Sequence, residues 1–97
     1  MATRLEQRLV HMAKTRPDAR ALFHHIASSK RVRRQPSIQS LVKILQGRDP
    51  RITDKNLREV ITDLEREGDP PLVCYMGQSV RFSNQFIELA CSVMRAL

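Results

Sequence analysis

The side chains best suited to chemistry in this chain are basic. Residues 30–34 read KRVRR, and Arg48, Arg51, Lys55 and Arg58 follow further along the sequence. Arginine and lysine bind phosphate oxygens, and arginine can also hydrogen-bond the edge of guanine. The KRVRR run leaves three interpretations open: an arm that grips phosphates, a solvated loop, or a nuclear-import or processing signal.

Histidines and cysteines give little support to a metal site or to catalysis. His24 and His25 are adjacent and point in different directions on a helix, and the spacing of His11, Cys74 and Cys91 matches no zinc pattern. The sequence contains no Gly-rich phosphate loop and no GxSxG or HExxH motif. We therefore expect a protein that is not an enzyme and that binds no metal or cofactor.

The charge of the chain is unevenly distributed. Its 97 residues carry a net charge of +7. Residues 1–51 hold 12 basic and 3 acidic residues, a net of +9, whereas residues 52–97 hold 5 and 7, a net of −2. A basic half indicates nucleic acid or another polyanion as a partner, although basic residues also serve solubility.

The apolar residues describe one globular domain without a membrane segment. Hydrophobic content is 41% and charged content 28%, as in soluble proteins. No apolar run approaches the ~18 residues of a membrane span, and no signal-peptide core is evident at the N-terminus. We expect a cytoplasmic protein with reduced cysteines, nucleoid-associated in a bacterium, or nuclear in a eukaryote or its virus.

Apolar periodicity predicts five helices. They cover residues 3–14, 17–29, 38–46, 54–67 and 84–97. The first two are separated at Pro17 or form one kinked helix. Ser37, Thr53 and either Ser83 or Asn84 are the expected N-caps.

Glycine and proline predict where two of these helices end. Gly47 is expected in the left-handed position that follows the helix over 38–46. Gly68 and Pro70-Pro71 should stop the helix over 54–67.

Residues 72–83 read as a β-hairpin. Gly77-Gln78 suits a type II′ turn, with Gly in the first central position. This register pairs Val73 with Phe82 and Tyr75 with Val80 on one face. The other face then carries Cys74 paired with Arg81 and Met76 paired with Ser79.

This order of elements resembles the winged helix-turn-helix superfamily. The resemblance covers about residues 37–83 and is carried by Leu41 and Leu45, the helix after Ile52-Thr53, its EREG ending, and the LVCYMGQSVRF ribbon. It implies a mainly α fold with a small antiparallel hairpin, in which 37–67 is the helix-turn-helix, 72–83 the wing, and 3–29 and 84–97 are additional helical parts of one domain, 1–97.

The resemblance also implies a DNA-binding surface, with the helix over 54–67 in the major groove. The residues expected to contact nucleic acid are Lys30, Arg31, Arg33, Arg34, Arg48, Arg51, Lys55, Asn56, Arg58 and Arg81. One basic patch around Arg48, Arg51, Lys55 and Arg58 is expected. Against this stands the charge of 54–67 itself, which holds five acidic and three basic residues, a net of −2.

The terminal helices offer more apolar surface than a small core needs. We expect them either to pack on each other within one chain or to form a homodimer interface, as in proteins that bind palindromic half-sites. The predicted interface residues are Leu5, Leu9, Met12, Phe86, Leu89, Ala90, Val93, Met94 and Leu97.

Two functions follow from the sequence. The first is a double-stranded DNA-binding protein, a small transcriptional or replication regulator acting as a homodimer. The second is a winged-helix adaptor that binds another protein and does not use its recognition helix on DNA.

Overall fold

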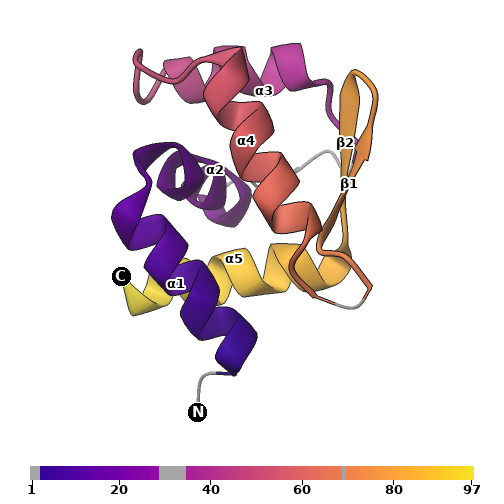
Figure 1. The fold of residues 1–97 in the computed structure, drawn as a ribbon. Coiled ribbons are helices and arrows are strands. Elements are labelled where there is room, and N and C mark those ends of the chain that lie inside the picture. Colours follow the sequence, from indigo (N-terminus) through magenta and orange to yellow (C-terminus); the bar gives the residue numbers. More distant parts are fainter. Residues whose placement is uncertain (1–2, 29–34, 69) are drawn as a thin grey trace.

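The computed structural model describes residues 3–28, 35–68 and 70–97. These residues form a mainly helical domain with one two-stranded antiparallel sheet (Figure 1). The elements run in the order α1 (Arg4–Thr15), α2 (Pro17–Ser28), α3 (Ile38–Gln46), α4 (Asp54–Glu65), β1 (Val73–Met76), β2 (Ser79–Phe82) and α5 (Asn84–Ala96). In Figure 1, α3 lies at the top and α5 at the bottom, and the hairpin stands beside α4.

The first two helices are separate rather than one kinked helix. Arg16 between them has extended backbone angles (φ −127°, ψ 108°), and α2 begins at Pro17. The proline ring disfavours helical angles in the residue before it and suits the first position of a helix. Arg16 is thereby held at a corner of the fold.

Three predicted N-caps are confirmed. The hydroxyl oxygens of Ser37, Thr53 and Ser83 accept hydrogen bonds from the backbone N–H three residues later, at 3.1, 3.2 and 3.1 Å. Each bond satisfies one N–H that the first turn of a helix leaves without a partner. Of the two candidates for the last cap, Ser83 takes the role.

The predicted helix ends are only partly correct. α4 ends at Glu65 rather than at residue 67, and Gly68 follows in the left-handed region with φ +82°. The prediction for Gly47 was wrong, because its φ is −63° and its ψ −25°. The N–H groups of Gly47 and Arg48 bond Ile44 and Leu45 carbonyls in a right-handed turn, so no left-handed residue is needed there.

The hairpin register is confirmed at all four pairs: Val73–Phe82, Cys74–Arg81, Tyr75–Val80 and Met76–Ser79. Gly77 has φ +74° and no non-glycine residue in the described chain has a positive φ, a combination that fits a type II′ turn and excludes type I′. Val73, Val80 and Phe82 are buried, whereas Tyr75 is 40% exposed. The hairpin tip therefore projects beyond the core.

A short segment before α3 pairs with the free edge of β2, which the sequence did not indicate. The N–H of Val80 donates to the carbonyl of Pro36 at 3.0 Å, and the N–H of Ile38 donates to the carbonyl of Gln78 at 2.9 Å. Ser37 and Ser79 form an isolated antiparallel bridge. These bonds fix the start of α3 against the hairpin.

The core is formed by one chain. α2 packs on α1, α3, α4 and α5, and α4 also packs on β1. Phe86 of α5 lies between Phe23 and Phe82, with ring centroids 5.8 and 5.4 Å away. Such tilted and edge-to-face contacts are favourable aromatic arrangements.

The predicted dimer interface is wrong for four of its nine residues. Leu9, Phe86, Ala90 and Val93 have no exposed side-chain surface within a single chain, because α1 and α5 pack on each other and on α2. Four others are half-buried against the core, namely Leu5, Met12, Leu89 and Met94. Leu97 is 40% exposed. Intramolecular packing of the terminal helices thus uses most of their apolar surface.

Candidate nucleic-acid interface

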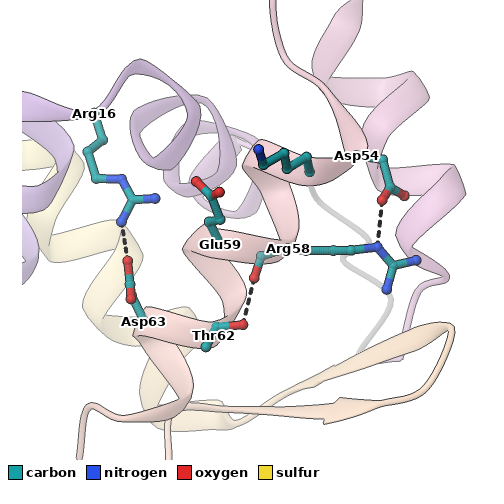
Figure 2. A pocket seen from close by; sticks show the side chains of 7 residues that line it. Arg16, Asp54, Arg58, Glu59, Thr62 and Asp63 are labelled. Carbon is teal, nitrogen blue, oxygen red and sulfur yellow. Dashed lines mark hydrogen bonds and ion pairs between the residues drawn. The ribbon is translucent and has the colours of Figure 1, made fainter.

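The outward face of α4 forms a shallow groove. Leu57, Val60, Ile61 and Leu64 are buried and fix the orientation of the helix. The opposite side lines a depression of about 680 Å³ (Figure 2). Its lining residues are Arg16, Asp54, Lys55, Arg58, Glu59, Thr62 and Asp63.

Arg58 connects this helix to the hairpin. Its Nε donates to Oδ1 of Asp54 at 2.5 Å, and its Nη1 donates to the hydroxyl of Tyr75 in β1. The guanidinium carbon lies 5.8 Å from the centroid of the Tyr75 ring, within cation–π range. The hydrogen bond to Asp54 above all raises the pKa of Arg58, so this group stays charged. Arg58 is thus a fixed cation where α4 meets the β1–β2 hairpin.

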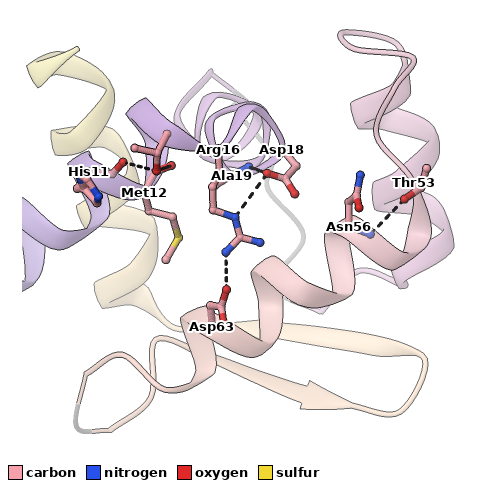
Figure 3. Close-up of polar contacts among 9 residues, drawn as sticks. His11, Met12, Arg16, Asp18, Ala19, Thr53, Asn56 and Asp63 are labelled. Atoms are coloured by element: carbon pink, nitrogen blue, oxygen red, sulfur yellow. Dashed lines mark hydrogen bonds and ion pairs between the residues drawn. The ribbon is translucent and has the colours of Figure 1, made fainter.

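Two further acidic residues of the 54–67 segment have arginine partners from α1 and the corner after it. Arg16 pairs with Asp63 (Figures 2 and 3), and Arg8 Nη1 lies 3.4 Å from Glu67 Oε2. These two arginines cancel the net of −2 that the segment carries in sequence. No pattern in the sequence predicts the Arg16–Asp63 pair, because its partners are 47 positions apart.

The remaining acids of this segment differ in their contacts. Glu65 Oε2 accepts the N–H of Tyr75 at 2.7 Å, on the edge of β1 that β2 does not use. Asp54 is bonded to Arg58 as described. Glu59 is exposed, and none of the ion pairs within the described ranges includes it. Four of the five acids therefore have an in-chain partner.

The basic residues expected to form one patch are divided between several places. Arg51 and Asn56 line a second depression of about 270 Å³ with Pro17, Asp18, Asp49 and Ile52, whereas Lys55 and Arg58 line the first. Asn56 is half-buried there, and its backbone N–H is the one that Thr53 caps (Figure 3). The structure therefore does not bring Asn56 onto the same groove as Lys55.

The turn between α3 and α4 holds its own ion pair. Arg51 Nε and its backbone N–H both donate to Oδ1 of Asp49 at 3.1 Å. These bonds lower the pKa of Asp49 and raise that of Arg51. The Arg51 side chain is 84% exposed, so the guanidinium remains accessible to solvent while it is paired.

Arg48 points toward α2 instead. Its Nη1 lies 3.5 Å from Nε2 of His24. Burial, and secondarily the positive charge of Arg48, lower the pKa of His25. Arg48 is thus placed beside a helix that the sequence did not assign to the interface.

The last predicted contact residues lie apart from the α4 groove or outside the described chain. Arg81 is exposed on the face of the hairpin that carries Cys74, beside Pro70 and Pro71 in a depression of about 410 Å³. Lys30, Arg31, Arg33 and Arg34 lie outside the described residues. Within the described ranges, no three His, Cys, Asp or Glu side chains are grouped to hold a metal ion.

Comparison with protein-family models, with curated proteins and with solved structures gave no match. Among the described residues, every helix is too short or too polar to cross a bilayer.

Proposed function

We propose that this chain is a winged helix-turn-helix protein that binds double-stranded DNA through α4 and the β1–β2 hairpin. The order of elements supports the proposal: α2, a strand-like segment at residues 36–38, α3, α4 and then a hairpin. The segment at 36–38 bonds the free edge of β2 and so gives the hairpin a short third partner. In this arrangement α4 is the recognition helix and the Gly77-Gln78 turn is the tip of the wing.

The observation that carries the proposal is the neutralisation of α4. Acidic side chains close to phosphates repel DNA. Arg16 and Arg8 compensate Asp63 and Glu67, so the acids at the C-terminal end of the segment are already paired before DNA arrives. The first half of the helix then presents Lys55 and the fixed cation Arg58.

These residues have distinct tasks in the proposed complex. Lys55 is exposed near the N-terminus of α4 and contacts phosphate. Arg58 is held by Asp54 and Tyr75 and offers its remaining N–H donors to a guanine edge or a phosphate. Glu59 lies on the same face, where a carboxylate can accept a hydrogen bond from cytosine.

A titration of the protein against a DNA duplex tests the proposal. Fluorescence anisotropy of a labelled 20-base-pair duplex at about 100 mM salt should give at least tenfold weaker binding for Lys55→Gln/Arg58→Gln than for the unaltered chain. The matched control is Lys14→Gln/Arg95→Gln, which also removes two positive charges, from exposed positions that line neither the α4 groove nor the Arg51 depression. Equal affinities for the two variants would rule out α4 as the DNA-binding surface.

An adaptor function is the second candidate, and the hairpin tip favours it. Tyr75 and Met76 are 40% and 49% exposed, and large apolar side chains at a tip suit a protein partner better than a phosphate backbone. The same titration separates the two functions. Absence of duplex binding even at about 20 mM salt would leave the adaptor as the function that fits the structure.

The homodimer remains part of the proposal in a reduced form. Its candidate contacts are the five predicted interface residues with exposed or half-exposed side chains: Leu5, Met12, Leu89, Met94 and Leu97. Sedimentation with and without a duplex containing two half-sites measures whether a second copy joins only on DNA.

A further inference from the structure

The outer face of α1 carries a row of polar and basic residues to which the proposed function assigns no contact with DNA. Arg4, Arg8 and His11 recur at helical spacing and lie on one side of the helix with Gln7 and Thr15. They line a groove of about 510 Å³, which also includes Met12, Arg16 and Glu67. With histidine neutral, three arginines against one glutamate give this α1 groove a charge of +2.

The α1 groove adjoins the α4 groove. Arg16 lines both of them. The ion pairs Arg8–Glu67 and Arg16–Asp63 hold α1 and the corner after it against the last turns of the 54–67 segment. The two grooves thus form one continuous surface, which is balanced in charge along α4 and net positive along α1.

We propose that the α1 groove is a second phosphate-contact surface, which binds the backbone of the same duplex beside the segment held by α4. The inference rests on the proposed function. A 12-residue helix is ~18 Å long, which matches about five base-pair steps of 3.4 Å. Arg4 and Arg8 make the contacts, since Arg16 is already bonded to Asp63 and lies 3.8 Å from Asp18.

Arg4 and Arg8 are suited to contacting phosphate because their side chains are exposed and have N–H donors that are not used within the described chain. None of the ion pairs in the described ranges includes Arg4. The side chain of Arg8 is 64% exposed and its single pair with Glu67 is 3.4 Å long, which leaves other donors of its guanidinium for phosphate. Such contacts carry no sequence information, so they should strengthen binding to every duplex equally.

The test is the salt dependence of Arg4→Gln/Arg8→Gln on a random 20-base-pair duplex. Loss of two phosphate contacts should reduce the slope of log K against log salt by about 1.8. Raising salt from about 50 to 200 mM should then weaken the variant about 12-fold less than it weakens the unaltered chain. Lys14→Gln/Arg95→Gln removes the same charge from α1 and α5 outside the groove and should leave the slope unchanged.

Glu67→Gln provides a test of opposite sign. This change removes the negative charge of the α1 groove and releases Arg8, so it should tighten duplex binding and steepen the salt dependence. A groove that faces solvent in the complex predicts no change. Far-UV circular dichroism of each variant establishes that the fold is retained.

The outcomes separate this inference from the proposed function. If the unaltered chain binds no duplex at about 20 mM salt, both fail. If it binds and Lys55→Gln/Arg58→Gln weakens binding, but Arg4→Gln/Arg8→Gln keeps the full slope, only the α1 contact is refuted. If the α1 variant alone loses slope, α1 binds DNA and α4 is not the recognition helix.

Discussion

Arg16 offers the sharpest test of how this fold manages the charge of α4. Its guanidinium bonds Asp63 and lies 3.8 Å from Asp18, and its side chain is 28% exposed. Exposed ion pairs contribute ~0.2–1 kcal/mol, and two carboxylates around one partly buried guanidinium place Arg16 at the upper end of that range. We expect Arg16→Gln to lower the free energy of unfolding by about 1 kcal/mol, which lowers Tm by about 4 °C or slightly more in a domain of this size.

A double-mutant cycle separates the pair from its surroundings. Asp63→Asn, Arg16→Gln and the double variant are compared by urea unfolding, where the coupling between the two sites should be about 0.5–1 kcal/mol. In the Asp63→Asn variant Arg16 still lies close to the carboxylate of Asp18, so this change alone should lower the free energy of unfolding less than Arg16→Gln does. Additive effects of the two changes would refute a stabilising Arg16–Asp63 pair.

The same variants make a prediction on DNA. Arg16→Gln exposes the charge of Asp63 in the α4 groove and should weaken duplex binding severalfold. The double variant has no charge at either position and should bind like the unaltered chain. If the double variant instead binds as weakly as Arg16→Gln, the arginine touches DNA directly and its role as a neutraliser of Asp63 is refuted.

Four further outcomes follow from the packing and the turns. Phe86→Ala should cost about 3–5 kcal/mol by urea unfolding, since its ring contacts both Phe23 and Phe82 in the core; a loss below about 1 kcal/mol would contradict that packing. Gly68→Ala should cost about 1–2 kcal/mol because φ is +82°, whereas Gly47→Ala, with φ −63°, should stay within about 0.5 kcal/mol of the unaltered chain. Burial first and Arg48 second lower the pKa of His25 below 6.5, so the folded chain holds that proton less readily than the unfolded chain. The free energy of unfolding should therefore be unaffected by His25 above about pH 6.5 and should fall as the pH drops toward the lower pKa of the folded state. His25→Gln should flatten this part of the Tm–pH curve. Because one chain closes the core, Tm should not change between about 5 and 200 µM protein, and a rise with concentration would indicate that folding requires a second copy.

Local chemistry accounts for what the sequence predicted correctly. The caps at Ser37, Thr53 and Ser83, the break before Pro17 and the hairpin register depend on residues within a few positions of each other. The stop of α4 before Gly68 and Pro70-Pro71 belongs to the same class, although the helix ends two residues earlier than predicted. Even locally, two backbone conformations can end a helix in the same place. The prediction for Gly47 is a left-handed conformation, yet a right-handed turn provides donors for the same carbonyls of α3.

Contacts between distant segments account for what the sequence missed. Pairing of residues 36–38 with β2 depends on where the hairpin lies, and no alternation in that segment marks it as a strand. The apolar stripe of α5 looked too wide for one core, but α1 and α2 both pack on this helix and use it within the chain. Sequence gives the width of an apolar face and leaves the number of its partners undetermined.

The charge of α4 depends on the same kind of distant contact. Counted along the chain, the 54–67 segment is acidic, and an acidic helix argues against DNA. Counted in space, Arg8 and Arg16 belong to the same surface and offset the excess, while Asp18, 3.8 Å from Arg16, adds one further acid. Screening at physiological salt limits the influence of an exposed charge to roughly 8–10 Å, so the relevant sum covers neighbours in space rather than in sequence. The residues that line the α4 groove are balanced in charge, and Glu59 is an exposed acid among them. If Glu59 contacts a base, Glu59→Gln should alter the sequence preference of duplex binding. If this face contacts only phosphates, Glu59→Gln should increase the affinity for every duplex equally.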